Sequence, residues 1–245
     1  YRLKDPDVYA EWYGTAHRHP QILPNTVYGL PELYREKITR ALLTANPGCY
    51  PTSVILPLCP ALENELIDTD GIVADSKSGA TGAGRKEALA THFCEVSDSF
   101  RAYNLGKHRH TPEIEQELSF VAGRDLRVSF NTHLLPMNRG ILSTIYTHLK
   151  KNHSLDAVHS LYLKWFENEP WVRVLPKGTL PETRWVRGTM FCDVGIAVDS
   201  RTNRLILVSA VDNLCRGASG QALANANLMC GLPMTFGLDT APLMP

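Results

Sequence analysis

Apolar residues recur every three or four positions in several stretches of the chain, and this spacing predicts helices. The clearest case is segment 30–42, where the apolar residues repeat at helical spacing and Pro31 suits the first turn of a helix. Further helices are expected from about Cys49 toward Leu66, from Pro112 to Leu118, over 155–167, and over the alanine-rich segment 214–229.

Alternating or β-branched residues predict strands at 72–75, 126–131, 140–149, 171–175, 191–198 and 204–211. The opening stretch up to Pro31 is rich in aromatic residues, histidine and proline, which favours loop with a short helix. The later strands follow one another with few helices between them, which predicts a mixed or antiparallel sheet. We therefore expect an α+β fold for the half of the chain that contains these strands.

The composition is that of an ordinary globular protein, with 245 residues, 44% of them hydrophobic, and 25 basic residues against 25 acidic ones. Zero net charge gives no general attraction to nucleic acid or an anionic membrane, so a bound anion must be held locally. Because no apolar run is long enough to span a bilayer and no signal peptide is present, we expect a cytoplasmic protein. A chain that begins at Tyr1 is expected to be a processed or truncated product.

Six cysteines are scattered through apolar segments, and none forms a C-x-x-C pair or a Cys/His spacing typical of zinc. This usage is typical of a reduced cytosolic enzyme, and we expect no metal site. For most of these cysteines the default interpretation is a small buried hydrophobic residue.

Cys49 is the strongest single candidate for chemistry, because of the turn that precedes it. Gly48 permits a tight turn and Pro51 suits a first helical turn, so Cys49 is predicted to lie at a helix N-terminus. Free N–H groups and the helix dipole can lower a thiol pKa there to between roughly 3.5 and 7.5. The same N–H groups can form an oxyanion hole. The alternative is that Cys49 merely packs at a helix start.

Two histidines flank an arginine in segment 106–114 (GKHRHTPEI), just before the helix expected at Pro112. Either His108 or His110 can be the general base of a thiol mechanism, with His108 preferred. Arg109 can clamp a carboxylate or phosphate through paired hydrogen bonds. Glu113 can pair with Arg109 or simply favour the helix N-terminus. Each histidine alone is more often a capping or surface residue, but their combination favours a site.

A glycine-rich loop, segment 76–85 (SKSGATGAGR), follows the strand predicted at 72–75. Its G-x-x-G-x-G spacing is neither the dinucleotide fingerprint nor a P-loop. Such a loop can still form a nest of N–H groups around phosphate, with Ser78, Thr81 and Arg85 as further donors. A flexible surface loop is an equal alternative. Arg139, in the turn 135–140, is a weaker anion-binding candidate that is more simply explained as solvated.

A strand gives way to a helix of small residues in segment 211–222 (VDNLCRGASGQA). Small residues let a helix approach another backbone or a flat cofactor ring. Asp212 or Asn213 can cap this helix, which is compatible with an amide contact to a cofactor.

Six segments together resemble the N-acetyl-γ-glutamyl-phosphate reductase family. They are 27–32 (VYGLPE), 45–52 (ANPGCYPT), 78–85 (SGATGAGR), 108–114 (HRHTPEI), 138–140 (NRG) and 212–221 (DNLCRGASGQ). They occur in the family's order and cover nearly the whole chain, and the first, second and fourth are highly specific.

The resemblance implies an NADP-dependent oxidoreductase of arginine biosynthesis that reduces N-acetyl-γ-glutamyl phosphate to the 5-semialdehyde. In the family, the cysteine matching Cys49 displaces phosphate to form a thioester, which hydride reduces through a thiohemiacetal. A histidine of the motif matching His108 and His110 handles the proton. The residues expected to bind substrate or phosphate are Arg109, Ser78, Gly79, Arg85, Arg139 and Glu113, and those expected to bind the cofactor are Asn213, Gly79, Gly82 and Gly217.

The resemblance also implies a catalytic domain of the glyceraldehyde-3-phosphate-dehydrogenase type. We expect residues 46–212 to form this α+β catalytic and oligomerisation domain. Residues 1–45 are expected to be the tail end of an α/β Rossmann domain, to which 213–245 return as a C-terminal helix. Family members assemble through the sheet, so we expect a homodimer or homotetramer. Because the family's glycine-rich βαβ unit has no counterpart here, hydride transfer by this chain alone is expected to be impaired.

Two alternatives remain at this stage. The chain can be a reductase of a related acyl phosphate, such as aspartyl phosphate or a carrier-bound aminoadipyl phosphate. It can also be a non-catalytic fragment that acts as an interaction domain, although the retention of Cys49, His108, Arg109 and the glycine loop argues against decay.

Overall fold

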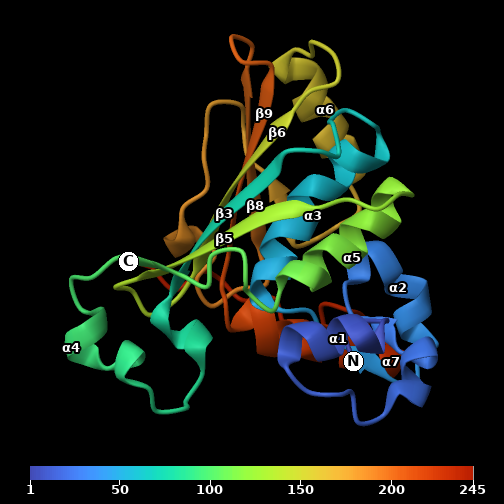
Figure 1. Ribbon diagram of the computed structural model, residues 1–245. Helices are drawn as coiled ribbons and strands as arrows, with labels where there is room; N and C mark the ends of the chain where they lie inside the picture. The colour runs from blue at the N-terminus through green and yellow to red at the C-terminus, as the bar shows by residue number, and fades with distance from the viewer. Residues whose placement is uncertain (245) are drawn as a thin grey trace.

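A seven-stranded sheet dominates the computed structural model, which describes residues 1–244 (Figure 1). The strands lie in the order β4-β5-β3-β6-β9-β8-β7. β3–β5 and β7–β8 are parallel, and the other neighbours are antiparallel. The mixed sheet confirms the α+β prediction. The bounds are β3 Ile72–Gly79, β4 Arg101–Tyr103, β5 Val128–Leu135, β6 Ile141–His148, β7 Val172–Val174, β8 Cys192–Asp199 and β9 Arg204–Val211.

Helices cover one face of this sheet. In β3, Ile72, Ala74 and Ser76 are buried beneath them, while Val73 and Asp75 on the opposite face are only half-buried. Figure 1 shows the covering helices side by side on that face: α3 (Cys49–Glu63), α5 (Thr111–Ala122) and α6 (Leu155–Trp165). The strand period of two therefore separates a core face from a more open face, as the alternation predicts.

The central helix α3 is buried along almost its whole length and contains Pro57 and Pro60. Pro57 has no N–H, so the carbonyl of Ser53, four residues earlier, lacks its helical donor. The hydroxyl of Ser209 in β9 donates to that carbonyl at 2.5 Å. The Ser53 hydroxyl lies 2.8 Å from that of Ser143 in β6. These bonds fix α3 on the sheet, and with it the position of Cys49 at its first turn.

A smaller unit precedes α3 in the sequence. Strands β1 (Val27–Tyr28) and β2 (Thr44–Ala45) are parallel, and helix α2 (Pro31–Thr39) connects them. Helix α7 (Gly220–Met229) returns from the far end of the chain and packs on α2. The side chains of Gln221 and Asn225 in α7 both donate to the carbonyl of Gly29. The opening stretch adds α1 (Pro6–Tyr13) and the 3-10 turn Pro20–Asn25.

The closing helix differs from the prediction of one continuous helix over 214–229. A π-helical turn, Cys215–Ser219, precedes α7. The Asp212 carboxylate accepts from the N–H groups of Leu214 and Cys215, both at 2.8 Å, which holds the chain in a tight turn. The wider turn also carries Arg216 into the interior, where it pairs with Glu32.

Residues 80–100 form an excursion between β3 and β4 that extends away from the sheet (Figure 1). It contains short helical turns at Ala80–Ala83 and Leu89–Thr91 and the four-residue helix α4 (Phe93–Val96). Leu89 is 70% exposed and Phe93 84% exposed, so the excursion presents apolar side chains to solvent. A last 3-10 turn, Thr183–Trp185, lies between β7 and β8.

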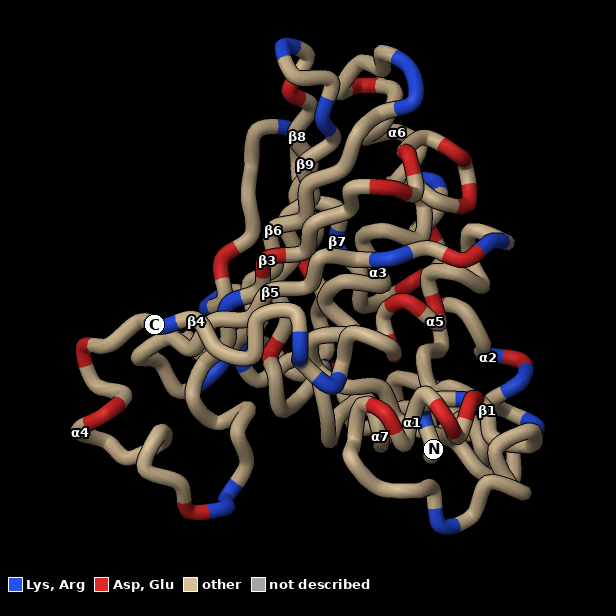
Figure 2. The backbone as a smooth tube through the Cα atoms, viewed as in Figure 1, with Lys and Arg blue, Asp and Glu red and all other residues tan. Residues whose placement is uncertain are grey.

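Charged residues of both signs are dispersed over the fold without a large single-sign region (Figure 2). Among residues 1–244, no helix combines the length and the apolar character needed to cross a lipid bilayer.

Candidate active site

Cys49 is the first residue of α3, and Gly48 is its N-cap residue with extended backbone angles. This confirms the predicted helix start. Cys49 is half-buried, and the backbone of Gly217 lies directly beside its Cα and Cβ atoms. A Cβ atom at position 217 would lie 2.6 Å from the Cβ of Cys49, so only glycine fits there. The turn before α7 therefore lies against the residue that begins α3.

Glu113, in the first turn of α5, holds the turn before Cys49 in place. Its carboxylate is 1% exposed and accepts hydrogen bonds from the Gly48 N–H at 2.8 Å, the Tyr28 hydroxyl at 2.8 Å and Arg2 Nη1 at 3.0 Å. Expected as a substrate-binding residue, Glu113 is instead surrounded by protein donors. Its geometry is that of a buried support for the Gly48 turn.

The pKa of the Cys49 thiol is opposite in direction to the sequence-based expectation. Burial raises it to about 11, and the negative charge of Glu113 adds to that rise. The N–H groups of Tyr50 and Cys49 at the helix start, together with Arg2, act in the lowering direction but do not outweigh burial. In the free protein the sulfur is therefore a neutral thiol near pH 7.

His108 lies among aromatic rings. Its ring centroid is 5.3 Å from that of Tyr50, 5.5 Å from Phe130 and 5.9 Å from Tyr103. Burial, followed by the neighbouring His110, lowers the pKa of His108 to about 3. The backbone N–H of His110 donates to His108 Nδ1 at 3.1 Å. The neutral ring therefore carries its proton on Nε2 and presents that atom as a donor.

His110 is the N-cap residue of α5, and its ring lies against the turn before Cys49. Its Nε2 is 3.3 Å from Arg2 Nη1, and a Cβ atom at Gly48 would lie 2.6 Å from the same nitrogen. Burial, then the positive charges of Arg2 and Arg109, lower the pKa of His110 to about 3. The structure thus brings both predicted histidines to the Cys49 turn as neutral rings.

The three predicted anion-binding arginines lie on the surface. Arg109 is exposed, with its guanidinium 5.5 Å from the ring centroid of Tyr13. Arg85, in the excursion, and Arg139, in the turn between β5 and β6, are also exposed. Their positions leave them accessible to a ligand, and their roles stay predictions.

The glycine-rich segment does not form the predicted amide nest at residues 79–81, and its first four residues, 76–79, belong to strand β3. The N–H groups of Gly79, Ala80 and Thr81 all donate to carbonyls of segment 137–140. A Cβ at Gly79 would lie 2.8 Å from the carbonyl oxygen of Met137, so this glycine serves the close approach of two chain segments. The Ser78 hydroxyl donates to the Gly79 carbonyl at 3.0 Å. The turn is thus braced by protein, which leaves fewer donors for phosphate than the sequence indicates.

Asn213 links this loop to the π-helical turn. Its side-chain oxygen accepts from the Gly140 N–H at 2.7 Å, and its Nδ2 donates to the Thr81 hydroxyl at 3.0 Å. A Cβ at Gly82 would lie 3.7 Å from that Nδ2. Gly217 thus lies against Cys49, and Gly82 lies beside Asn213, so little side-chain bulk is present at either point. The second Nδ2 hydrogen of Asn213 is left as a donor, and the binding of a nicotinamide ring by these residues stays a prediction.

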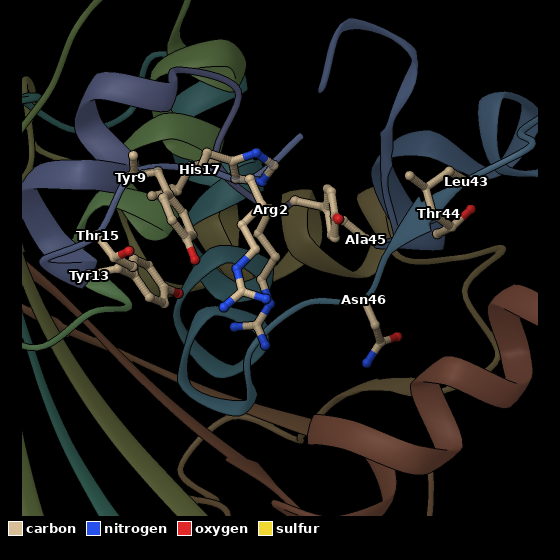
Figure 3. A pocket seen from close by; sticks show the side chains of 13 residues that line it. Arg2, Tyr9, Tyr13, Thr15, His17, Leu43, Thr44, Ala45 and Asn46 are labelled. Carbon is tan, nitrogen blue, oxygen red and sulfur yellow. The ribbon is translucent and has the colours of Figure 1, made fainter. Parts of the chain in front are cut away.

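A cavity of about 650 Å³ adjoins the Cys49 turn (Figure 3). Tyr9 and Tyr13 of α1 line one side, and Ala45 and Asn46 line the other. Arg2 lies between these two sides, and its guanidinium also reaches Glu113 and His110. The cavity and the histidine cluster therefore share a residue.

Three residues of this site escape the sequence analysis. Arg2 lies in a polar stretch assigned to loop, and nothing in its neighbourhood signals a contact with Glu113, 111 positions away. Tyr28 lies in the VYGLPE motif, but the bond of its hydroxyl to Glu113 depends on the packing of β1 against α5. In the sequence, Arg216 is only a polar residue within an apolar helical segment. In the structure its side chain is fully buried.

Comparison with known proteins identifies the relatives of this chain. Residues 49–213 match the model of the semialdehyde dehydrogenase dimerisation domain. The N-acetyl-gamma-glutamyl-phosphate reductase of Geobacter metallireducens is 56% identical over 246 residues, which covers all of this chain and 71% of that protein. The enzyme of the same name from Pelotomaculum thermopropionicum is 54% identical over 245 residues, with the same coverage.

Solved structures with the same fold are aspartate semialdehyde dehydrogenases. Aspartate semialdehyde dehydrogenase II from Vibrio cholerae superposes with a TM-score of 0.66 at 15% identity, over 85% of this chain and 69% of that one. A probable aspartate-semialdehyde dehydrogenase from Pseudomonas aeruginosa gives 0.65 at 15% identity, over 84% and 68%. At this identity the match establishes the architecture alone.

Proposed function

The chain belongs to the N-acetyl-gamma-glutamyl-phosphate reductase family, and on that premise we propose that it reduces N-acetyl-γ-glutamyl phosphate to N-acetylglutamate 5-semialdehyde and phosphate, a step of arginine biosynthesis. The observation that carries this proposal is the placement of two neighbouring neutral histidines at the Gly48 turn, which leads directly into a half-buried cysteine at a helix start. The family consists of oxidoreductases that use a nicotinamide cofactor. NADP is the form we propose for this chain.

The first step is attack of the Cys49 sulfur on the acyl carbon of the substrate. Because burial keeps the thiol pKa at about 11, the proton must leave as the sulfur attacks, and a neutral imidazole can accept it. We assign this acceptor role to His110, whose Nε2 lies at the Gly48 turn, in place of the expected His108. Nε2 accepts from Arg2 Nη1 at 3.3 Å in the free protein, so this contact must open when the thiol proton is transferred. The S–C bond forms and the bond from carbon to the phosphate oxygen breaks. Phosphate is released, and the acyl group stays bound to Cys49 as a thioester.

Negative charge develops on the acyl oxygen during this step. The N–H groups of Cys49 and Tyr50 at the start of α3 are suited to receive it, as an oxyanion hole requires. His108, whose proton lies on Nε2, is suited to donate to the same oxygen. The cofactor supplies the hydride when bound, and Asn213, Gly82 and Gly217 are the residues proposed to hold its ring beside Cys49.

We assign residues 1–45 and 213–245 to the nucleotide-binding part of the protein, and 46–212 to catalysis and assembly. The support is the parallel β1–α2–β2 unit, which is the crossover element of nucleotide-binding folds. Helix α7 returns to the same unit through its bonds to Gly29. Buried contacts between this unit and α5 then align the cofactor part with the cysteine.

The match to a dimerisation domain supports assembly of identical chains. We propose that the more open face of the sheet, together with the exposed apolar residues of the 80–100 excursion, contributes to the interface. Light scattering coupled to gel filtration tests this, because replacement of Phe93 by aspartate is expected to weaken assembly.

The function is tested in the reverse direction with the full-length protein. N-acetylglutamate semialdehyde, NADP and phosphate are mixed, and formation of the reduced coenzyme is followed by absorbance. Activity is expected to require phosphate and to fall about a thousandfold or more in Cys49→Ser. Cys94→Ser, which removes an exposed cysteine of α4 in the 80–100 excursion, is the matched control and is expected to keep full activity. Faster turnover of aspartate semialdehyde would favour the alternative substrate, and phosphate-independent activity would contradict the mechanism.

A further inference from the structure

We propose that Arg2 is a positioning residue for His110: its guanidinium bridges the Glu113 carboxylate and His110 Nε2, and so holds the ring with its proton on Nδ1 and its acceptor nitrogen, Nε2, at the Cys49 turn. The guanidinium must then withdraw from Nε2 when the thiol proton is transferred to that nitrogen. This inference rests on the proposed function, in which His110 accepts the thiol proton.

The first step of the argument is the direction of the hydrogen bond. A guanidinium has only donors, so where Arg2 Nη1 lies 3.3 Å from His110 Nε2, the imidazole nitrogen must accept. A neutral imidazole has a single proton, which then lies on Nδ1. His110 Nδ1 is buried without a hydrogen-bond partner among the described residues, so nothing else in this part of the chain selects that tautomer.

The second step concerns charge. An isolated cation beside His110 would oppose proton uptake by the ring. Arg2 is instead paired with Glu113, whose carboxylate lies 3.0 Å from the same Nη1 atom. The pair orients the imidazole while adding no net charge to the site. Loss of Arg2 would leave the buried Glu113 carboxylate near His110 without its cationic partner.

The third step is how Arg2 reaches this place. Leu3, the next residue, is buried, and the side chain of Gln116 binds the backbone on both sides of it. Gln116 Nε2 donates to the Arg2 carbonyl at 3.0 Å, and the Lys4 N–H donates to Gln116 Oε1 at 2.8 Å. Gln116 lies one turn after Glu113 on α5, so one helix anchors the backbone of Arg2 and receives its guanidinium.

The test compares Arg2→Met, which removes donor and charge, with Arg2→Lys, which keeps both on a flexible stem. Arg18→Met is the matched control, because Arg18 lines the same cavity and no contact with Glu113 or His110 is recorded for it among the described residues. Imidazole nitrogen NMR reports the tautomer and titration of His110 without any need for catalysis.

In the wild type and in Arg18→Met we expect the Nδ1–H tautomer and no titration of His110 above about pH 5. In Arg2→Met we expect mixed tautomers, a raised His110 pKa and a kcat about ten- to a hundredfold lower, with a smaller change in KM. Arg2→Lys is expected to recover part of the wild-type tautomer population and part of the wild-type kcat. The inference is overturned if Arg2→Met, folded by circular dichroism, keeps the wild-type tautomer and titration.

Failure of the proposed function is distinguishable from failure of this inference. A wild-type protein that shows no phosphate-dependent activity but has the expected His110 tautomer would overturn the function alone. Should Arg2→Met not fold, Arg2→Lys carries the test. If Arg2→Lys has an altered His110 tautomer but an undiminished kcat and an unchanged pH dependence of kcat/KM at acidic pH, the orientation of the ring does not matter for catalysis. That result would overturn the positioning role.

Discussion

The backbone N–H of Gly48 donates a 2.8 Å hydrogen bond to the buried carboxylate of Glu113, 65 residues further along the chain. This bond joins the residue before Cys49 to the first turn of the helix that His110 caps. The candidate nucleophile and the candidate base are therefore positioned by one carboxylate, which also binds Tyr28 and Arg2. Changes at Glu113 should move both partners of the proton transfer.

Replacement of Glu113 by glutamine is expected to lower the free energy of unfolding by about 1–3 kcal/mol, because a neutral amide keeps one acceptor but presents N–H groups to existing donors. Replacement by alanine should cost more. Chemical denaturation and kcat give the readout. Glu115→Gln is the control, since Glu115 lies on the same helix but binds Arg127 and the Val128 N–H. Equal loss of kcat in both glutamine variants would contradict the assigned role.

The rate of Cys49 alkylation by iodoacetamide is expected to rise about tenfold per pH unit between pH 7 and pH 9, because only the thiolate reacts and burial raises the thiol pKa to about 11. Peptide mapping by mass spectrometry separates Cys49 from the exposed Cys94 and Cys230. A plateau of the Cys49 rate below pH 7 would mean that the helix N-terminus outweighs burial.

Gly217→Ala is expected to lower kcat by at least about tenfold, because the new methyl group would lie 2.6 Å from Cys49 Cβ and must displace the cysteine or the π-helical turn. Ala222→Ser, an exposed change in α7, is the control and should be near neutral. Steady-state kinetics and a thermal melt decide the matter. An unaltered Gly217→Ala enzyme would show that the turn is free to move away from Cys49.

Arg216 and Glu32 form a buried ion pair, with both side chains essentially inaccessible to solvent. Arg216→Met should lower the free energy of unfolding by about 3–5 kcal/mol, because it leaves a buried carboxylate without its partner. The double variant Arg216→Met with Glu32→Met is expected to be more stable than that single variant. Urea denaturation of all four proteins forms the cycle, and additive losses would exclude coupling between the two residues.

Acid should destabilise the fold through His108 and His110. Burial lowers their folded pKa to about 3, so below the ordinary value of about 6.5 the unfolded chain binds protons that the native state does not. Their stabilising contribution is thus complete above about pH 6.5 and is lost as the pH falls toward 3, at up to about 1.4 kcal/mol per unit for each ring. Denaturation curves from pH 7 to pH 4.5 measure the slope.

His108→Asn is expected to reduce that slope, since asparagine keeps an acceptor near the position of Nδ1 but does not titrate. His92→Asn replaces an exposed histidine and should leave the slope unchanged. If the free energy of unfolding falls with pH equally in wild type and His108→Asn, then His108 takes up its proton in the native state as readily as in the unfolded chain.

Local patterns in the sequence were sufficient for the regular elements and for the candidate nucleophile. The period of two in β3 and β6 and the period near 3.6 in α6 depend only on neighbouring residues, and Gly48 and Pro51 mark the start of α3 because each acts on its own backbone angles. Short elements such as β4 and the two-residue strands β1 and β2 could not be predicted from local patterns, because two or three residues are too few to show a period.

The chemistry of the site was decided only by tertiary structure. Whether a helix start lowers a thiol pKa depends on how much water and how much neighbouring charge surround the sulfur, and here burial and Glu113 prevail. The tautomers of His108 and His110 likewise depend on a backbone N–H and on Arg2, which approach them only in the folded chain. Sequence fixes which groups are present, whereas desolvation and hydrogen-bond direction arise from distances between segments far apart in the chain.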